Sequence, residues 1–201
     1  MNKSTDVELS LDDLQEMLSN PTQMSPIMYQ YYRCLQNRKI IINDQISSDI
    51  IEYAVIPLID MDNDGTNKPI EIILNTVGGE VYSGFCLVDA LEKLKCKTTI
   101  RIMGMAASMG ILIAMVKNPN ITVICSRFSV GLIHSGSQYM EGSTHAVRDT
   151  FKFSERYEEL IKEYILNHTT IDEKMYKEIE RQEFWMTADD MKKYGIVNEV
   201  I

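Results

Sequence analysis

The stretch Ala106-Ala107-Ser108-Met109-Gly110 joins two apolar segments, residues 98–103 before it and 108–116 after it. The first segment is typical of a buried strand and the second of a short helix. Ser108 would then stand at a helix N-terminus, where free backbone N–H groups favour developing negative charge. The small neighbours would let a substrate backbone approach closely, as an activated nucleophile requires. A serine that only caps the helix fits the same stretch.

Short apolar runs alternate with amphipathic segments around this stretch. The apolar runs predict strands at residues 39–43, 70–75, 98–103, 121–125 and 196–201. The amphipathic segments predict helices at 8–19, 26–38, 47–60 and 82–94, then at 145–167, 171–181 and 187–193. Strands that alternate with helices are typical of βαβ units and a largely parallel sheet. The sequence therefore predicts one α/β domain with a helical C-terminal extension.

Two further segments carry residues suited to catalysis. Asn75-Thr76-Val77-Gly78-Gly79 follows a predicted strand, and a glycine pair there can aim backbone N–H groups at an oxyanion. A plain strand-to-helix turn fits the same residues. Gly131-Leu132-Ile133-His134 ends an apolar run with a histidine, either a general base or a satisfied core residue. The other histidines, His145 and His168, belong to the predicted long helix, where exposure or capping explains them.

Together these three segments resemble the proteolytic subunits of the ATP-dependent Clp protease (ClpP). That family has an N-x-P-G-G turn, then A-A-S-M-G, then M-I-H, and the stretches 184–188 (FWMTA) and 194–197 (YGIV) are similar too. The resemblance runs from about Arg33 to the end. It implies a crotonase-like (ClpP-type) α/β fold, with a ββα-type spiral core and a protruding handle at about 135–168. Residues 33–201 would form a single peptidase domain behind a divergent N-terminal helical or axial segment, 1–32.

The resemblance implies roles for three side chains. It assigns Ser108 as the nucleophile and His134 as its general base. The third family residue is an aspartate, and counting back from Tyr194-Gly195 places Glu183 at its position. A glutamate can orient a histidine, although its extra methylene changes the reach. Glu183 also belongs to the acidic run 177–183, so a surface charge is the alternative.

Backbone groups near the site receive roles by the same resemblance. The N–H groups of Gly79 and Met109 would form the oxyanion hole, and Gly78 and Gly136 would contact the substrate. Val77 replaces the family's proline in the glycine turn, and the proline that follows the family's histidine is replaced by Gly136 or absent. These changes alter loop stiffness more than chemistry.

The implied function is a serine endopeptidase that hydrolyses peptides and unfolded proteins inside a self-assembled ring. The family stacks two seven-membered rings and works with a Clp-type ATPase, so ATP would be used only by that separate partner and no cofactor is expected. Here residues 1–30 are acidic and helix-prone, and Glu71 and Ile73 stand where bacterial members often place tyrosines of the ATPase-docking pocket. These departures, with Glu183, leave a catalytically impaired ring or regulatory subunit as the alternative.

Two other activities fit the sequence less well. An acyl-CoA hydratase or isomerase on the same fold needs acid–base carboxylates beside the oxyanion hole, where this chain has Ser108 and His134. Some serine peptidases on this fold use a lysine base. Lys117 is the one lysine close after Ser108, and it lies poorly placed at the end of the predicted short helix.

Residues 60–71 contain a competing pattern. Asp60-x-Asp62-x-Asp64-Gly65, followed after five residues by Glu71, fits a calcium-binding loop. A strand rather than a helix is predicted after it, however, and Glu71 would have to leave that strand to bind a cation. A solvated loop rich in Asp and Asn fits the segment better, so no metal site is expected.

Composition and charge bear on the remaining classes of protein: nucleic-acid-binding, membrane and secreted proteins. A net charge of −9 argues against nucleic acid as a partner, because nucleic-acid binding needs a basic surface. No apolar run reaches membrane-spanning length, and no apolar segment of a signal peptide follows the N-terminus. The four cysteines are far apart without a C-x-x-C pair, which favours free thiols in a reducing cytoplasm.

Overall fold

The computed structural model describes residues 25–137 and 139–201. The chain divides into two compact units, Met1–Asn37 and Arg38–Ile201. The predicted helix at 8–19 lies outside the described residues, as does most of the predicted N-terminal segment.

The described part of the first unit contains helix α2 (Pro26–Gln36). The helix begins after Ser25, whose hydroxyl accepts a hydrogen bond from the Met28 amide at 3.2 Å. Serine before the helix and proline at its first position are a typical start, because the serine satisfies a free N–H and proline lacks one. The helix predicted at 26–38 is therefore present, and it ends two residues early, at Gln36.

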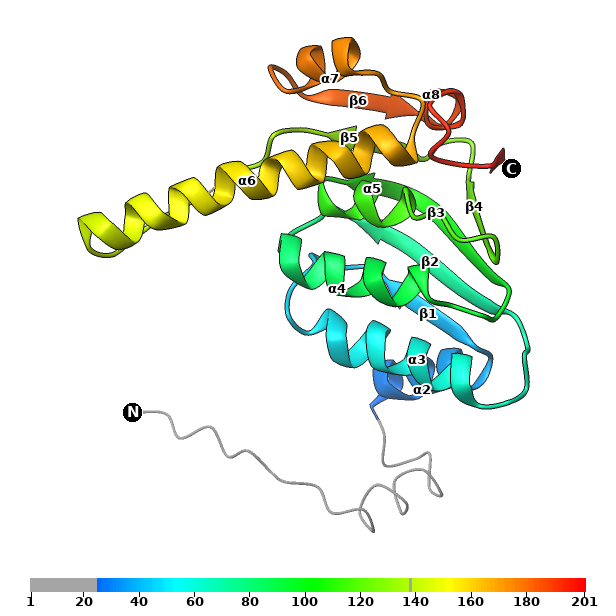
Figure 1. The fold of residues 1–201 in the computed structure, drawn as a ribbon. Helices are drawn as coiled ribbons and strands as arrows, with labels where there is room; N and C mark the ends of the chain where they lie inside the picture. Colours follow the sequence, from blue (N-terminus) through cyan, green and yellow to red (C-terminus); the bar gives the residue numbers. More distant parts are fainter. Residues whose placement is uncertain (1–24, 138) are drawn as a thin grey trace. The chain divides into compact units, whose positions relative to one another are not determined.

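A parallel sheet forms the centre of the second unit (Figure 1). In order across the sheet, its strands are β1 (Lys39–Ile42), β2 (Ile70–Thr76), β3 (Thr98–Ala107), β4 (Ile121–Cys125) and β7 (Glu199–Val200). Each neighbouring pair along this order is parallel. The prediction of a largely parallel sheet is confirmed. Burial alternates along β2, because its successive side chains point to opposite faces of the sheet.

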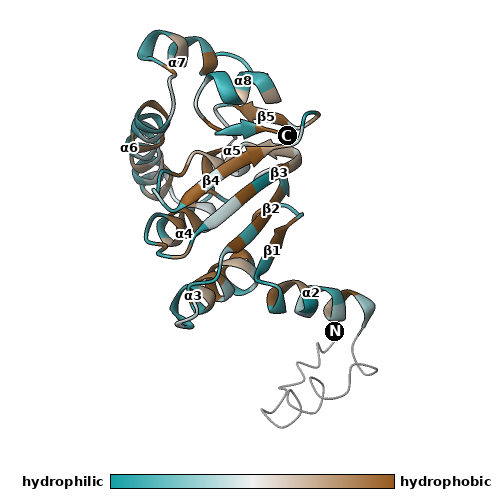
Figure 2. Ribbon diagram, turned by 90° about the vertical axis from the view of Figure 1, so that its right-hand side faces the viewer, coloured by the Kyte–Doolittle hydropathy of each residue, from teal (hydrophilic) through white to brown (hydrophobic). Residues whose placement is uncertain are grey.

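Helices α3 (Ile56–Asn63) and α4 (Val81–Glu92) lie along one face of this sheet (Figure 2), and α5 (Met109–Ala114) follows β3. A π-helical turn at Ile51–Val55 precedes α3, so the predicted helix at 47–60 begins and ends later than expected. The core contains fully buried aliphatic side chains from strands and helices, among them Ile40, Ile72, Leu87, Leu91 and Ile100. Burial of each such side chain stabilises the fold by about 1.5–3 kcal/mol.

Strand β3 runs past its predicted end at residue 103 because its two halves have different partners. Thr98–Ile102 pairs with β4, whereas Met105–Ala107 pairs with β5 (Val130–Ile133). On its other side, β5 pairs antiparallel with β6 (Phe184–Thr187). Ala106 and Ala107, expected to form part of an elbow, are therefore strand residues, and the turn begins at Ser108.

Three helices complete the second unit: α6 (Thr144–His168), α7 (Glu173–Ile179) and α8 (Ala188–Lys193). Each matches its predicted range within two residues. The first half of α6 runs out beyond the sheet (Figure 1), within the residues predicted to form the handle. In the part of the chain that the structure describes, no helix is both long and apolar enough to span a membrane.

Candidate active site

Ser108 occupies a strained turn between β3 and α5. Its φ of 53° and ψ of −122° are a combination that L residues rarely adopt. The turn is held by the next strand of the sheet, because the Ser108 amide donates to the Leu132 carbonyl oxygen at 2.9 Å. Strained backbone of this kind clusters at functional sites, and a serine on a sharp strand-to-helix turn is the arrangement of an exposed nucleophile.

The predicted glycine turn lies directly against Ser108. A Cβ atom added to Gly78, whose φ is 89°, would stand 2.7 Å from the Ser108 Cβ and 2.9 Å from the Met109 nitrogen. A Cβ added to Gly79 would overlap the carbonyl oxygen of Ile46. Both positions therefore require glycine because neighbouring backbone fills the space that a side chain would need.

The backbone amides of Gly79 and Met109 are unused donors in this turn. Ile46 holds the chain on either side of Gly79, since its amide donates to the Gly78 carbonyl and its own carbonyl accepts from the Glu80 amide, both at 2.8 Å. Within the described residues, neither the Gly79 nor the Met109 amide donates a hydrogen bond. Amides left free beside a nucleophile are what an oxyanion hole requires.

His134 follows the last residue of β5 and lines the same pocket as Ser108. The pairing of β5 with the end of β3 brings the two residues together, since Ala107 lies opposite Leu132. In the described part of the chain, the Ser108 hydroxyl and the His134 ring share no hydrogen bond. Catalytic hydrogen bonds in enzymes without bound substrate are often long and tighten only in the complex.

Glu183 precedes β6 and is exposed. Its carboxylate accepts a hydrogen bond from the Trp185 indole N–H at 3.1 Å. In the β5–β6 ladder Ile133 lies opposite Phe184, so one further step of the same register would place Glu183 opposite His134. The structure thus brings the two residues to adjacent strand ends, with the carboxylate turned toward the indole.

The pocket beside Ser108 has a volume of about 130 Å³. Its apolar lining comes from five elements and includes Val81, Met109, Leu112, Ile133, Ile161, Ile165 and Ile179. Gly136 and two carboxylates, Glu158 and Glu180, line it as well. The sequence did not predict that residues of α6 and α7 line this pocket. The spacing of Glu158, Ile161 and Ile165 on one face of α6 was the available signal.

Lys117, the alternative base, lies away from this pocket. Its ammonium group donates to the Gly195 carbonyl oxygen at 2.8 Å, and it is not among the residues that line the pocket with Ser108. Burial lowers the pKa of Lys117. The lowered pKa therefore reflects burial of a side chain that lies outside the pocket of Ser108.

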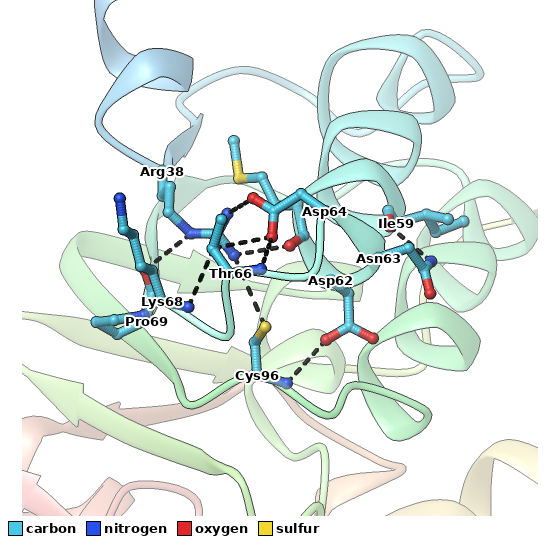
Figure 3. Close-up of polar contacts among 10 residues, drawn as sticks. Arg38, Ile59, Asp62, Asn63, Asp64, Thr66, Lys68, Pro69 and Cys96 are labelled. Carbon is cyan, nitrogen blue, oxygen red and sulfur yellow. Dashed lines mark hydrogen bonds and ion pairs between the residues drawn. The ribbon is translucent and has the colours of Figure 1, made fainter.

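The acidic loop at residues 60–71 has its own internal partners (Figure 3). Arg38 pairs with the Asp64 carboxylate and donates to the Met61 carbonyl oxygen at 2.7 Å. Asp62 instead accepts from the amides of Lys95 and Cys96, at 2.9 and 2.8 Å. A guanidinium thus occupies the Asp64 carboxylate, which stands at a ligand position of the calcium-loop pattern. Among the described residues, no group of three or more His, Cys, Asp or Glu is placed to hold a metal.

Comparison with known proteins identifies the class of this chain. Residues 23–201 match the Clp protease family, so the chain belongs to that family and has its crotonase-like α/β fold.

Two relatives sharpen the assignment, and each is named an ATP-dependent Clp protease proteolytic subunit. The protein from Deinococcus radiodurans is 28% identical over 174 residues, which cover 85% of this chain and 83% of that protein. The protein from Cyanophora paradoxa is 25% identical over 170 residues, covering 84% of this chain and 86% of that one. The chain is therefore a divergent ClpP-like serine peptidase.

Proposed function

We propose that this chain is an endopeptidase in which Ser108 attacks the scissile carbonyl and His134 accepts the serine proton. The observation that carries the proposal is the strained backbone of Ser108, which stands beside two unused amides and in one pocket with His134. The attack would form a tetrahedral oxyanion, stabilised by the Gly79 and Met109 amides. Gly78, which lies against Ser108, and Gly136, which lines the pocket, would lie along the substrate backbone.

His134 would then return its proton to the leaving amine, and the acyl group would remain on Ser108 as an ester. A water molecule, deprotonated by the same histidine, would hydrolyse this ester and free the serine. Each of the two attacks, by Ser108 and by water, protonates His134 to a positive imidazolium, which a carboxylate stabilises. Glu183 is the candidate for that role, because the β5–β6 register leads it toward His134.

The hydrogen bond from Trp185 to Glu183 favours a second candidate function. While the carboxylate faces the indole, His134 lacks this orienting group. A subunit held in that state would be a catalytically impaired ring or regulatory subunit. Rotation of Glu183 toward His134 on ring assembly or substrate binding would convert it to the active form.

Ring assembly belongs to the same proposal. The projecting helix α6 exposes Phe151, Phe153 and Leu160, and Tyr139 before it is exposed as well. Exposed apolar groups of this kind mark interfaces. We propose that they join subunits into stacked seven-membered rings that enclose the sites and receive unfolded substrates from a Clp-type ATPase. Because that ATPase alone would use ATP, the peptidase itself would need no cofactor. The four free cysteines fit a cytoplasmic location.

Hydrolysis of a fluorogenic peptide by the assembled protein, compared with that by Ser108→Ala, tests the proposal. The variant is expected to lose on the order of 10³-fold or more in kcat, as removal of a triad nucleophile does. An active-site phosphonate should label the wild type at Ser108 and leave the variant unlabelled. Equal turnover by the two proteins would refute the assignment of Ser108.

A further inference from the structure

Thr76 is the last residue of β2 and comes directly before the glycine turn. The residue is buried, with 3% of its surface exposed, and its hydroxyl has a partner on each side. The hydroxyl donates to the Asp44 carbonyl oxygen at 2.6 Å and accepts from the Gly78 amide at 3.1 Å. Such a hydroxyl is costly to remove, because the carbonyl and the amide would each lose a partner.

The hydrogen bonds of Gly78 fix two successive peptide planes. The bond to Thr76 fixes the plane that contains the Gly78 amide, as a hydroxyl two residues back does in many turns. The Gly78 carbonyl lies in the next plane, together with the Gly79 amide, and accepts from the Ile46 amide at 2.8 Å. In a trans peptide the N–H points opposite to the C=O, so the Gly79 N–H points away from Ile46. These two bonds therefore set the direction of the free Gly79 amide.

The Thr76 hydroxyl also holds the loop that supplies Ile46. Its acceptor, Asp44, stands two residues before Ile46 in the segment that follows β1. Val77, between Thr76 and Gly78, is 63% exposed and does not restrict φ as a proline would. One hydroxyl thus connects the glycine turn to the loop that holds it from the other side.

The methyl group of Thr76 packs against the turn of the nucleophile. A Cβ atom added to Gly110 would lie 2.5 Å from the Thr76 Cγ2, so the methyl fills the space that a side chain there would need. Gly110 directly follows Met109, whose amide is the second unused donor. A glycine turn that is fixed to Thr76 is therefore fixed relative to the Met109 segment as well.

We propose that Thr76 is the positioning residue of the oxyanion hole, because its hydroxyl fixes the turn that directs the Gly79 N–H. The inference rests on the proposed function, since the Gly79 and Met109 amides would act on the oxyanion of that reaction. Thr76 is buried and does not line the pocket of Ser108, so it acts through the backbone alone. Loss of its hydroxyl should slow the formation of the oxyanion without weakening substrate binding.

Two substitutions test the role of the hydroxyl. Thr76→Val keeps the shape of the side chain and removes both hydrogen bonds, so kcat should fall by about 10- to 10²-fold while KM stays within about twofold. Thr76→Ser keeps the hydroxyl and should retain kcat within about threefold of the wild-type value. A loss as large in Thr76→Ser as in Thr76→Val would overturn the proposal, because the hydroxyl would not be its cause.

Thr98→Val is the matched control. Thr98 is also 3% exposed, and its hydroxyl donates to the Cys96 carbonyl oxygen at 3.1 Å. It begins β3, whereas Ser108 follows the other end of that strand, so Thr98→Val should leave kcat unchanged. Equal losses of kcat in Thr98→Val and Thr76→Val would overturn the proposal, because the cause would be general destabilisation.

Hydrogen exchange resolved to single amides tests the turn without any turnover. The Gly78 amide should exchange slowly in the wild type and in Thr98→Val, and about tenfold faster or more in Thr76→Val. Rapid exchange of this amide in the wild type would overturn the proposal even if Thr76→Val did not fold.

The two readouts separate this proposal from the proposed function. Wild-type kcat in Thr76→Val would overturn the role of Thr76 and leave the peptidase assignment standing. Slow exchange at Gly78 in a wild type that neither hydrolyses peptide nor takes the phosphonate at Ser108 would overturn the proposed function, while supporting the hold of Thr76 on the turn.

Discussion

Two loops of this chain match known sequence motifs, yet the fold uses their residues in opposite ways. At the Ser108 turn, segments far apart in the sequence bring a serine and a histidine to one pocket, and the amides of Gly79 and Met109 in the adjoining turns are unused. In the loop at 60–71, the acidic residues with described partners have different ones: Asp62 accepts from backbone amides, Asp64 pairs with Arg38, and Glu71 pairs with Lys39 and Arg101. Polar groups of a motif are available for catalysis or binding where the fold leaves them without partners. They have a structural role where the fold already supplies their hydrogen bonds and ion pairs.

The largest expected effect concerns Glu183 in the Ser108 region. Its carboxylate accepts from the Trp185 indole in the structure, and its proposed catalytic partner is His134. If its carboxylate turns to His134 during catalysis, Glu183→Gln should lower kcat by roughly 10²- to 10⁴-fold. Glu183→Asp restores the family residue but shortens the reach, so kcat should change in that variant too. The exposed neighbour Glu178, changed to Gln, is the matched control. Wild-type turnover in both Glu183 variants would mean a Ser-His dyad.

A pair of glycine substitutions compares the two loops directly. Gly78→Ala should reduce kcat by about 10²- to 10³-fold, since the new Cβ would displace Ser108 or the Met109 amide from the oxyanion position. Gly65→Ala has open space around its Cβ, and only its φ of 77° is unfavourable. It should cost about 1–2 kcal/mol of stability and leave kcat unchanged. Steady-state kinetics and denaturant unfolding check both, and similar kinetics for the two variants would contradict the comparison.

Arg38 tests whether the acidic loop is structural. Arg38→Ala leaves Asp64 without its charged partner and should lower the free energy of unfolding by about 1–3 kcal/mol, with kcat unchanged. Lys39→Ala, which removes an exposed ion pair to Glu71, should cost less than about 1 kcal/mol. Millimolar Ca²⁺ should leave the wild-type melting temperature unchanged. A calcium-dependent rise would show that the loop binds the ion despite Arg38.

The smallest effect is a pH dependence of the same loop. Hydrogen bonds from Thr66, and then the charge of Arg38, hold the pKa of Asp64 below its usual value. On acidification the unfolded chain therefore takes up this proton first, so the stabilisation is present above about pH 4 and is lost as the pH falls below it. The difference in unfolding free energy between wild type and Asp64→Asn should shrink from pH 7 to pH 3. If the difference in unfolding free energy between the two proteins stays constant over this range, the ionised Asp64 carboxylate is not the cause of that difference.

Periodicity and spacing predicted a large part of the molecule. The parallel direction of β1 to β4 follows from the alternation of apolar runs with amphipathic segments, and the length of α6 follows from one long amphipathic pattern. The segments that contain Ser108 and His134 could be identified as candidate catalytic segments, because small residues and glycines lie near the ends of the predicted strands.

Other features depend on contacts that a single sequence does not display. Strand β5 is short, and its pairing with Met105–Ala107 requires small residues, predicted to form a turn, to be a strand. Whether the Glu183 carboxylate contacts the Trp185 indole or His134 depends on its side-chain rotamer, and the sequence does not determine that rotamer. The carboxylates of the pocket, Glu158 and Glu180, belong to helices whose packing sets which residues face Ser108.

The antiparallel pairing of β5 with β6 also has a consequence for biosynthesis. The ribosome makes β5 together with His134, but β6 begins at Phe184, about fifty residues later. Until then β5 has an open edge, and the segment that carries Glu183 has not emerged. A nascent chain therefore contains Ser108 and His134 before it contains the strand that pairs with β5. Proteolytic competence can arise only after nearly the whole chain has been translated.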